Sequence, residues 1–385
     1  MAMLTPAFAA ALPLANRRPV ALPRARHVAA RRPALTAAAA DSPPAPASGK
    51  RVLIINAPSG GHSVIGPHLA EALLDAGHTV HVHQVGTPPA DKQPYDRYPP
   101  LSAAHPAAFS LSTGPAAEAP TADVDAVYDN AAKGVADAAP ALAAGAAGAE
   151  VFYVSSAGAY AYDGTLAPHV AGDDAAGPTI DVEAALRASG TLSAAFRPTY
   201  ILGPGFQNRQ YSDWLFDRIR DGRRIPIPGV PDALTCLTDV RDVAAMLAAA
   251  LGKGLHGEVL NATSPRAITL AGVVALAAAA AGADAAAVAD RVVWYDPADA
   301  AARVDGFVAK AAFPFRPRHF FADPVPAAPP VADVLGWRAE RSGDRDGLAA
   351  LLRDAHASYV ALGLDARVVD YTMDDAILAA VGGDA

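Results

Sequence analysis

The sequence predicts an α/β protein with a doubly wound parallel sheet and a smaller C-terminal lobe on the substrate side. Short apolar runs, typical of buried strands, alternate with helical stretches of ten or more residues. The first run, Arg51–Asn56, leads into a turn rich in glycine and serine. Beyond residue 204 this alternation breaks into shorter elements. We therefore expect a leader and linker over residues 1–45, a sheet domain over 50–204, and a lobe over 205–385 that is partly interleaved with the sheet.

The leader is basic and contains no acidic residue. Its six arginines, at positions 17, 18, 24, 26, 31 and 32, all precede the first acid, Asp41. Such Ala-, Pro- and Arg-rich sequence is typical of an organelle transit peptide, although an uncleaved basic tail has the same composition. We expect the mature chain to begin between Ala38 and Lys50. Without the leader the chain has 25 basic and 39 acidic residues, a net charge of −14. Any nucleic-acid contact must then come from a local basic patch.

The overall composition excludes several classes of protein. The single cysteine, Cys236, rules out an intrachain disulfide framework and a cysteine-rich zinc site. No run of about 20 strongly apolar residues is present, so a membrane-spanning helix is not expected. The alanine-rich stretch 267–283 is interpreted as a buried helix.

The remaining elements of the sheet domain follow in order. A helix begins near Pro67, a first-turn position that proline favours, and ends near Gly77, where a C-cap glycine is common. Further strands are predicted over residues 78–83, 124–128, 151–154 and 193–196. The proline-rich stretch 87–120 has no regular period, so we expect a surface excursion there.

A glycine turn, Ser59–Gly66, lies between the first strand and the first helix. Gly60 and Gly61 would let the backbone approach a pyrophosphate, and Gly66 would let the helix pack closely on the sheet. Short-chain dehydrogenases/reductases have a further glycine where this chain has Ser63. The turn predicts a Rossmann-like fold of the extended short-chain reductase type. It leaves two alternatives open, an NAD(P) site and a vestigial turn.

Two further features argue against hydride transfer. After the second strand the chain offers His83 and Gln84, where an NAD site has an acid for the ribose hydroxyls. No lysine lies four residues after any tyrosine, so the catalytic Tyr-x-x-x-Lys pattern is absent. Tyr160 therefore lacks the lysine that would stabilise its phenolate.

Asp129 and Asn130 follow a predicted strand, at the sheet edge where open α/β folds place their ligands. Carboxylate and amide oxygens suit Mg²⁺, so these two residues are our candidate metal ligands. The alternative is that Asp129 caps the next helix.

Two segments, Gly205–Pro228 and Lys310–Phe321, mix arginines with aromatic residues. Guanidinium groups beside aromatic rings suit RNA, because bases stack on the rings while phosphates are neutralised. The candidate RNA contacts are Arg209, Trp214, Arg218, Arg223, Arg224, Lys310, Arg316 and Arg318. Alternatively, the rings are core and the arginines line a nucleotide-sugar pocket, or Arg223 and Arg224 pair with Asp217 or Asp221.

Several motifs together resemble the chloroplast stem-loop binding proteins of 41 kDa, in particular the a-type form. They are Ser59-Gly-Gly-His-Ser-Val-Ile-Gly66, Tyr128-Asp-Asn130, Phe196-Arg-Pro-Thr-Tyr200, Lys310-Ala-Ala-Phe313, His319-Phe-Phe321 and Leu335-Gly-Trp337. These proteins are atypical short-chain reductases related to NAD-dependent epimerases and dehydratases. With other matching stretches, the resemblance covers nearly everything from residue 51 onward.

The resemblance implies a protein of the chloroplast stroma that binds stem-loop RNA without a membrane anchor. It also implies a divalent-metal-dependent endoribonuclease that acts in plastid ribosomal RNA maturation and transcript turnover. The expected partners are plastid ribosomal and messenger RNA, plastid ribosomal particles and a b-type paralogue in hetero-oligomers. Two alternatives remain, an NAD(P)-dependent sugar-nucleotide epimerase or reductase and a non-catalytic ribosome-associated factor.

Overall fold

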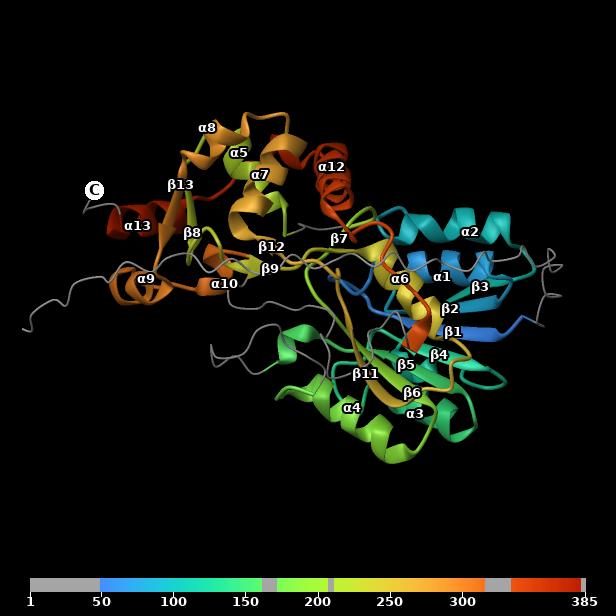
Figure 1. Cartoon of the computed structure of the whole chain (residues 1–385). Coiled ribbons are helices and arrows are strands. Elements are labelled where there is room, and N and C mark those ends of the chain that lie inside the picture. Colours follow the sequence, from blue (N-terminus) through green and yellow to red (C-terminus); the bar gives the residue numbers. More distant parts are fainter. Residues whose placement is uncertain (1–48, 161–171, 207–210, 316–333, 382–385) are drawn as a thin grey trace, which may run out of the picture. The chain divides into compact units, whose positions relative to one another are not determined.

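The computed structural model describes residues 49–160, 172–206, 211–315 and 334–381 (Figure 1). The chain separates into two units, Met1–Ala45 and Pro46–Ala385, and all described residues belong to the second. Three predicted RNA contacts, Arg209, Arg316 and Arg318, lie outside the described residues, as does the side chain of Lys310.

A seven-stranded sheet with the order β11-β6-β5-β4-β1-β2-β3 forms the centre of this unit. Its strands are β1 (Arg51–Asn56), β2 (Thr79–Val85), β3 (Phe109–Gly114), β4 (Ala126–Asp129), β5 (Glu150–Val154), β6 (Ser193–Pro198) and β11 (His256–Ala262). Every pair of neighbours is parallel. The chain moves outward from β1 in both directions, which confirms the predicted doubly wound, Rossmann-like α/β fold.

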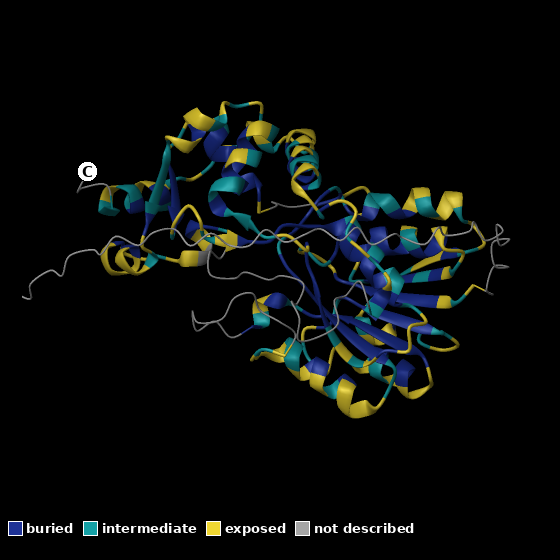
Figure 2. Cartoon of the chain, viewed as in Figure 1, coloured by how far each residue is buried: buried dark blue, intermediate teal, exposed yellow. Residues whose placement is uncertain are grey.

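Helices cover both faces of the sheet, so its central strands are buried on both sides (Figures 1 and 2). On one face lie α1 (Ile65–Asp75), α2 (Tyr98–Ala104) and α6 (Val240–Ala250); on the other lie α3 (Ala139–Ala146) and α4 (Pro178–Ser189). Alternation along β1 shows how one strand serves both layers. Ile54 packs in the core beside α1 and α6, while Leu53 and Ile55 pack in the core beside α3. Continuous apolar runs are the expected result of this arrangement.

The stretch 87–120 differs from the prediction, because it contains the edge strand β3 together with α2 and two short 3-10 helices, Tyr95–Arg97 and Ala116–Glu118. The sequence of β3 lacks an apolar run since only Phe109 of this strand is buried. Ser112, also on β3, hydrogen-bonds the imidazole rings of His81 and His83 on β2. A polar edge strand of this kind gives no hydrophobic signal in the sequence.

The rest of the chain forms a second lobe and also returns to the sheet through α6 and β11. The lobe comprises α5 (Asp213–Arg220), α7 (Leu270–Ala280), α8 (Ala285–Ala289), α9 (Pro297–Arg303), α10 (Ala309–Ala312), α12 (Arg345–Ala361) and α13 (Thr372–Val381). Its short strands are β7 (Ile201–Leu202), β8 (Ile225–Pro228), β9 (Leu234–Thr235), β10 (Thr238–Asp239), β12 (Ile268–Thr269) and β13 (Val292–Tyr295). Trp214, Phe216 and Leu351 are buried in its core, and α7 is the expected alanine-rich helix.

Helix length and polarity bear on the expected absence of a membrane span. None of the helices in the described part of the chain combines the length and apolar character that a membrane crossing requires.

Candidate functional site

The glycine turn between β1 and α1 is open on its outer side. Gly60 adopts φ of +79°, a conformation that favours glycine. The backbone N–H of Ser63 donates to the carbonyl of Gly60 at 3.1 Å and closes the turn. No atom lies within 4 Å of the place that a Cβ would occupy on Gly60 or Gly61. This part of the turn therefore leaves room for a ligand to approach the backbone.

The inner side of the same turn is filled by three buried amide side chains, Asn56, Gln84 and Asn130, at the carboxyl ends of β1, β2 and β4. We call them the amide cluster. Asn56 donates through Nδ2 to Oε1 of Gln84 at 2.7 Å, and Asn130 donates through Nδ2 to Oδ1 of Asn56 at 2.7 Å. A Cβ on Gly66 would lie 2.2 Å from Oδ1 of Asn56. Only glycine fits where α1 packs on this cluster.

The amide cluster changes the part of the fold that would hold a nucleotide ribose. Gln84, at the end of β2, donates through Nε2 to the carbonyl oxygens of Asn56 and Ala57 at 3.2 and 2.9 Å. An acid at this strand end would accept from ribose hydroxyls, whereas Gln84 is turned inward and its polar atoms have protein partners. The turn at Gly60 and Gly61 thus fits a pyrophosphate, but the end of β2 does not fit the NAD ribose.

The predicted metal ligands do not fit Mg²⁺. Asp129 accepts through Oδ1 from the backbone N–H groups of Ala131 and Ala132 at 3.0 and 2.9 Å, so it caps the turn after β4. Asn130 accepts through Oδ1 from the N–H of Ala57 at 2.6 Å, so its amide oxygen is already used. Within the described ranges, no group of three His, Cys, Asp or Glu side chains is placed to hold a metal ion. Asp129 Oδ2 alone would remain as a ligand.

Asp129 is an unusual carboxylate because it is buried without a cationic partner. Only 1 % of the residue is exposed, and its Oδ2 has no hydrogen-bond partner in the described structure. Burial raises the pKa of Asp129 to about 6, although the N–H groups of Ala132 and Ala131 act in the opposite direction. Asp129 therefore keeps its proton to a higher pH than a free aspartate does.

The surroundings of Tyr160 contain a glutamate and an arginine in place of the missing lysine. Tyr160 donates to Oδ1 of Asn261 at 2.5 Å, and the guanidinium of Arg197 lies 4.6 Å from the centre of its ring. Arg197 binds both carboxylate oxygens of Glu183, at 2.9 and 2.7 Å. Ser155 donates to the same carboxylate at 2.5 Å.

This arrangement does not generate a phenolate. Burial raises the pKa of Tyr160, and the nearby Arg197 charge only opposes that effect. Glu183 neutralises Arg197 in a buried pair. Sequence reasoning missed Glu183 and Asn261, because they lie on α4 and β11 and no local pattern joins them to Tyr160.

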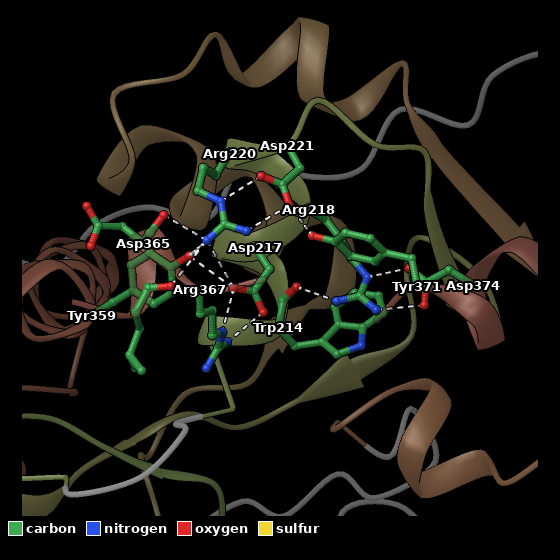
Figure 3. Close-up of polar contacts among 11 residues, drawn as sticks. Trp214, Asp217, Arg218, Arg220, Asp221, Tyr359, Asp365, Arg367, Tyr371 and Asp374 are labelled. Carbon is green, nitrogen blue, oxygen red and sulfur yellow. Dashed lines mark hydrogen bonds and ion pairs between the residues drawn. The ribbon is translucent and has the colours of Figure 1, made fainter. Parts of the chain in front are cut away.

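The predicted RNA-binding helix α5 presents its central pair of side chains to the protein interior. The guanidinium of Arg218 lies 3.5 Å from the centre of the Trp214 ring, and each residue is 3 % exposed (Figure 3). Arg218 binds both carboxylate oxygens of Asp374, on α13, at 2.7 and 2.6 Å. The arginine and the indole share one helix face, but an acid of this same chain occupies the position that a phosphate would take.

Further polar contacts tie α5 to the C-terminal segment (Figure 3). Asp217, which is fully buried, accepts two hydrogen bonds from Arg367 and one from Tyr359. Arg220 binds both oxygens of the neighbouring Asp221 at 2.6 and 2.7 Å. The hydrogen bonds from Arg220 hold the pKa of Asp221 at about 2. We refer to these contacts, together with Arg218–Asp374, as the α5 clasp.

The two remaining candidates on this segment differ from each other. Arg223 forms an ion pair with Asp375 on α13. Arg224 is exposed, and no ion pair is present at its guanidinium among the described residues. Of the two predicted RNA contacts past the end of α5, only Arg224 is thus an unpaired cation in the described structure.

Comparison with known proteins relates the chain to a chloroplast protein. No protein-family profile matches it. It is 31 % identical over 261 residues to the chloroplast stem-loop binding protein of 41 kDa b from Arabidopsis thaliana. The matched region covers 66 % of this chain and 64 % of that protein, so the chain spans less than two thirds of the relative's length. The relative is the b form, so it supports the resemblance to the group and not specifically to the a form.

Solved structures give the fold. A dTDP-glucose 4,6-dehydratase from Bacillus anthracis with NAD superposes with a TM-score of 0.60 at 13 % identity, covering 81 % of this chain and 97 % of that one. A UDP-glucuronic acid 4-epimerase from Bacillus cereus with UDP-glucuronic acid and NAD gives 0.58 at 14 % identity, covering 81 % and 99 %. A putative epimerase from Burkholderia cenocepacia gives 0.55 at 22 % identity, covering 82 % and 100 %. The chain therefore has the Rossmann-like fold of sugar-nucleotide epimerases and dehydratases, and its expected resemblance to the chloroplast stem-loop binding proteins of 41 kDa is confirmed.

Proposed function

We propose that this protein binds stem-loop RNA in the chloroplast, on a reductase scaffold that does not transfer hydride. The similarity over 261 residues to a chloroplast stem-loop binding protein carries the proposal. The basic, acid-free leader is consistent with import into a plastid. The geometry of the sheet edge supports the loss of redox chemistry.

The sheet edge argues against an active epimerase at two separate places. Gln84 is turned into the amide cluster, where an acid would bind the ribose. Tyr160 has a neutralised arginine beside it where a reductase places a lysine. Each change affects a different step, because one weakens cofactor binding and the other leaves Tyr160 without the lysine that would stabilise its phenolate.

A finer form of the proposal adds catalysis and partners. The resemblance implies divalent-metal-dependent cleavage of the bound RNA, a role in plastid ribosomal RNA maturation and transcript turnover, and a location in the stroma. It also implies association with ribosomal particles and with a b-type paralogue. Because Asp129 and Asn130 do not fit Mg²⁺, we assign no step of cleavage to them. A non-catalytic ribosome-associated factor is the same proposal without turnover.

One observation favours a second candidate, the binding of a nucleotide without redox chemistry. The open space beside Gly60 and Gly61 is the feature that a pyrophosphate needs. Two of the superposed structures contain NAD. NAD(P) could then bind weakly through its pyrophosphate, and no hydride would be transferred.

A binding experiment separates the proposed RNA binding from an active epimerase. The full chain is titrated with a stem-loop RNA and with an unstructured RNA of equal length, in Mg²⁺ and in EDTA, and the products are separated on a gel. We expect tighter binding of the stem-loop; cleavage only in Mg²⁺ would support the finer form. The same protein is assayed for NAD(P)H turnover with UDP-sugars. Turnover without preference for the stem-loop would overturn the proposal in favour of an epimerase.

A further inference from the structure

Exposed arginines gather on α12 and on the segment that precedes it. We use the name arginine strip for these four arginines together with Lys253 and with Arg266 from another loop. Its members are Lys253, Arg266, Arg338, Arg341, Arg345 and Arg353. All six residues are exposed. In the described part of the chain, no ion pair or hydrogen bond involves their charged groups. The strip therefore differs from α5, whose arginines are paired.

The first part of the strip lies along α6 (Figure 1). Leu335 packs in the same core as the apolar face of α6. The ammonium of Lys253, just beyond the C-terminus of α6, lies 4.0 Å from the place of a Cβ on Gly336. At the other end of α6, Asp242 accepts from the N–H groups of Arg341 and Ser342, at 3.2 and 2.7 Å. The segment thus runs antiparallel to α6, which is about 16 Å long for 11 residues.

The second part of the strip continues onto α12. Asp344 accepts from the N–H of Gly347 at 2.8 Å and fixes the start of this helix. The buried face of α12 includes Leu348, Leu352 and Tyr359, which pack in the core of the second lobe. Arg345 and Arg353 lie off this face and about 12 Å apart along the helix axis. Both residues are exposed.

The loop that carries Arg266 joins the strip from a third direction. Ser264 donates through Oγ to the carbonyl oxygen of Ser342 at 2.5 Å. This contact holds the loop against the residue that follows Arg341. Three segments far apart in the sequence thus bring cations to one region.

The local charge of this region is positive, although the mature body is acidic. Three exposed acids, Glu340, Asp344 and Asp346, lie among the six cations. Arg241 pairs with both Asp354 and the buried Asp239, at 2.8 and 2.5 Å, so these three residues together add one negative charge and the sum stays positive. The pKa of the nearby His68 is lowered to about 4, mainly by burial and in smaller part by the charges of Arg97, Arg241 and Arg341.

We propose that the arginine strip is the surface that contacts the phosphate backbone of a stem-loop RNA. This inference rests on the proposed function and names its surface. Phosphates bind cations that are not already paired. Among the described residues the strip offers six such cations, whereas α5 and the residues directly after it offer Arg224 alone. A base-paired RNA stem is recognised mainly by shape and by backbone contacts, which an elongated strip can make and a closed pocket cannot.

Neutralising part of the strip tests this assignment. The full chain is compared with Arg338→Gln/Arg341→Gln/Arg345→Gln and with a control, Lys92→Gln/Arg187→Gln/Arg303→Gln. The control removes three exposed charges that lie outside the strip. Binding of a stem-loop RNA is measured at several salt concentrations. Each lost phosphate contact should reduce the slope of log affinity against log salt by roughly 0.7–0.9. We expect the strip variant to lose about two to three in slope and the control to keep the slope of the parent chain.

Four further results decide the interpretation. If the parent chain binds and the two triple variants behave alike, the strip is not the surface, although the proposed function survives. If the parent chain does not bind the stem-loop, the proposed function fails and the strip fails with it. Thermal unfolding midpoints of all three proteins should coincide, because the substituted side chains are exposed. Arg353→Glu should by itself weaken binding; unchanged binding in this variant as well as in the triple variant would overturn the strip.

Discussion

The α5 clasp and the arginine strip use the same side chain for opposite purposes. On α5 the guanidinium of Arg218 is closed between Trp214 and Asp374, so it stabilises the lobe. On the strip, Arg341 and Arg345 are exposed without acidic partners in the described structure. Both segments contain several arginines and acids. They differ because Asp374 and Asp375, on α13, pair with arginines of α5 and of the residues after it. An arginine-rich segment is therefore a binding surface only where the chain leaves it unpaired.

Breaking the clasp should have the largest effect on stability. Asp374→Ala leaves Arg218 buried without its carboxylate, and such loss typically costs about 3–5 kcal/mol. The matched control is Asp375→Ala, which removes the exposed partner of Arg223 and should cost about 0–1 kcal/mol. Urea unfolding measures both values. Equal losses in the two variants would mean that the Arg218–Asp374 pair is not closed in solution.

Asp129 contrasts with Asp374, because both acids are buried but Asp129 has no arginine partner in the described structure. Its pKa is raised from 3.8 to about 6, so the fold binds the proton more tightly than the unfolded chain does. This contribution to stability is full below pH 3.8 and is lost as the pH rises through 6, by about 3 kcal/mol.

Asp129→Asn imitates the protonated acid and should remove this part of the pH dependence. Chemical unfolding between pH 4 and pH 7 compares the variant with the parent chain. Millimolar Mg²⁺ should leave both profiles unchanged. A Mg²⁺-dependent stabilisation that is present in the parent chain and absent in the variant would restore Asp129 as a metal ligand.

The smallest expected effect concerns the end of α5. Arg223→Gln/Arg224→Gln should flatten the salt slope of RNA binding by less than about one, because only Arg224 is unpaired. If both guanidinium groups were free to contact phosphates, the expected loss would be nearly two. The double variant is measured together with the strip variant. A loss of two or more in its salt slope would mean that the end of α5, and not the arginine strip, contacts the RNA phosphates.

The sequence was informative wherever a signal is local. The apolar run Arg51–Asn56 and the glycine turn predicted the first strand and the start of α1, and the structure confirms both elements. Trp214 and Arg218 were named together as candidate RNA contacts, and the structure places them four residues apart on one face of α5. The edge strand β3 was missed, since its residues are half polar and carry no apolar run.

Long-range partners could not be predicted. Asp374 lies 156 residues beyond Arg218, and Glu183 on α4 lies 14 residues before its partner Arg197 on β6. Nothing near Arg218 indicates that an acid will reach it. The four arginines between residues 338 and 353 are visible in the sequence, but their exposure depends on how this segment packs along α6.

Arginine footprinting tests the contrast between the two regions most directly. The full chain is treated with an arginine-specific dicarbonyl reagent, with and without a stem-loop RNA, and modification is located by mass spectrometry. We expect Arg218 to resist the reagent in both samples, and Arg338, Arg341, Arg345 and Arg353 to react in the free chain and be protected by RNA. Protection of Arg223 and Arg224 with continued reaction of these four arginines would contradict the account.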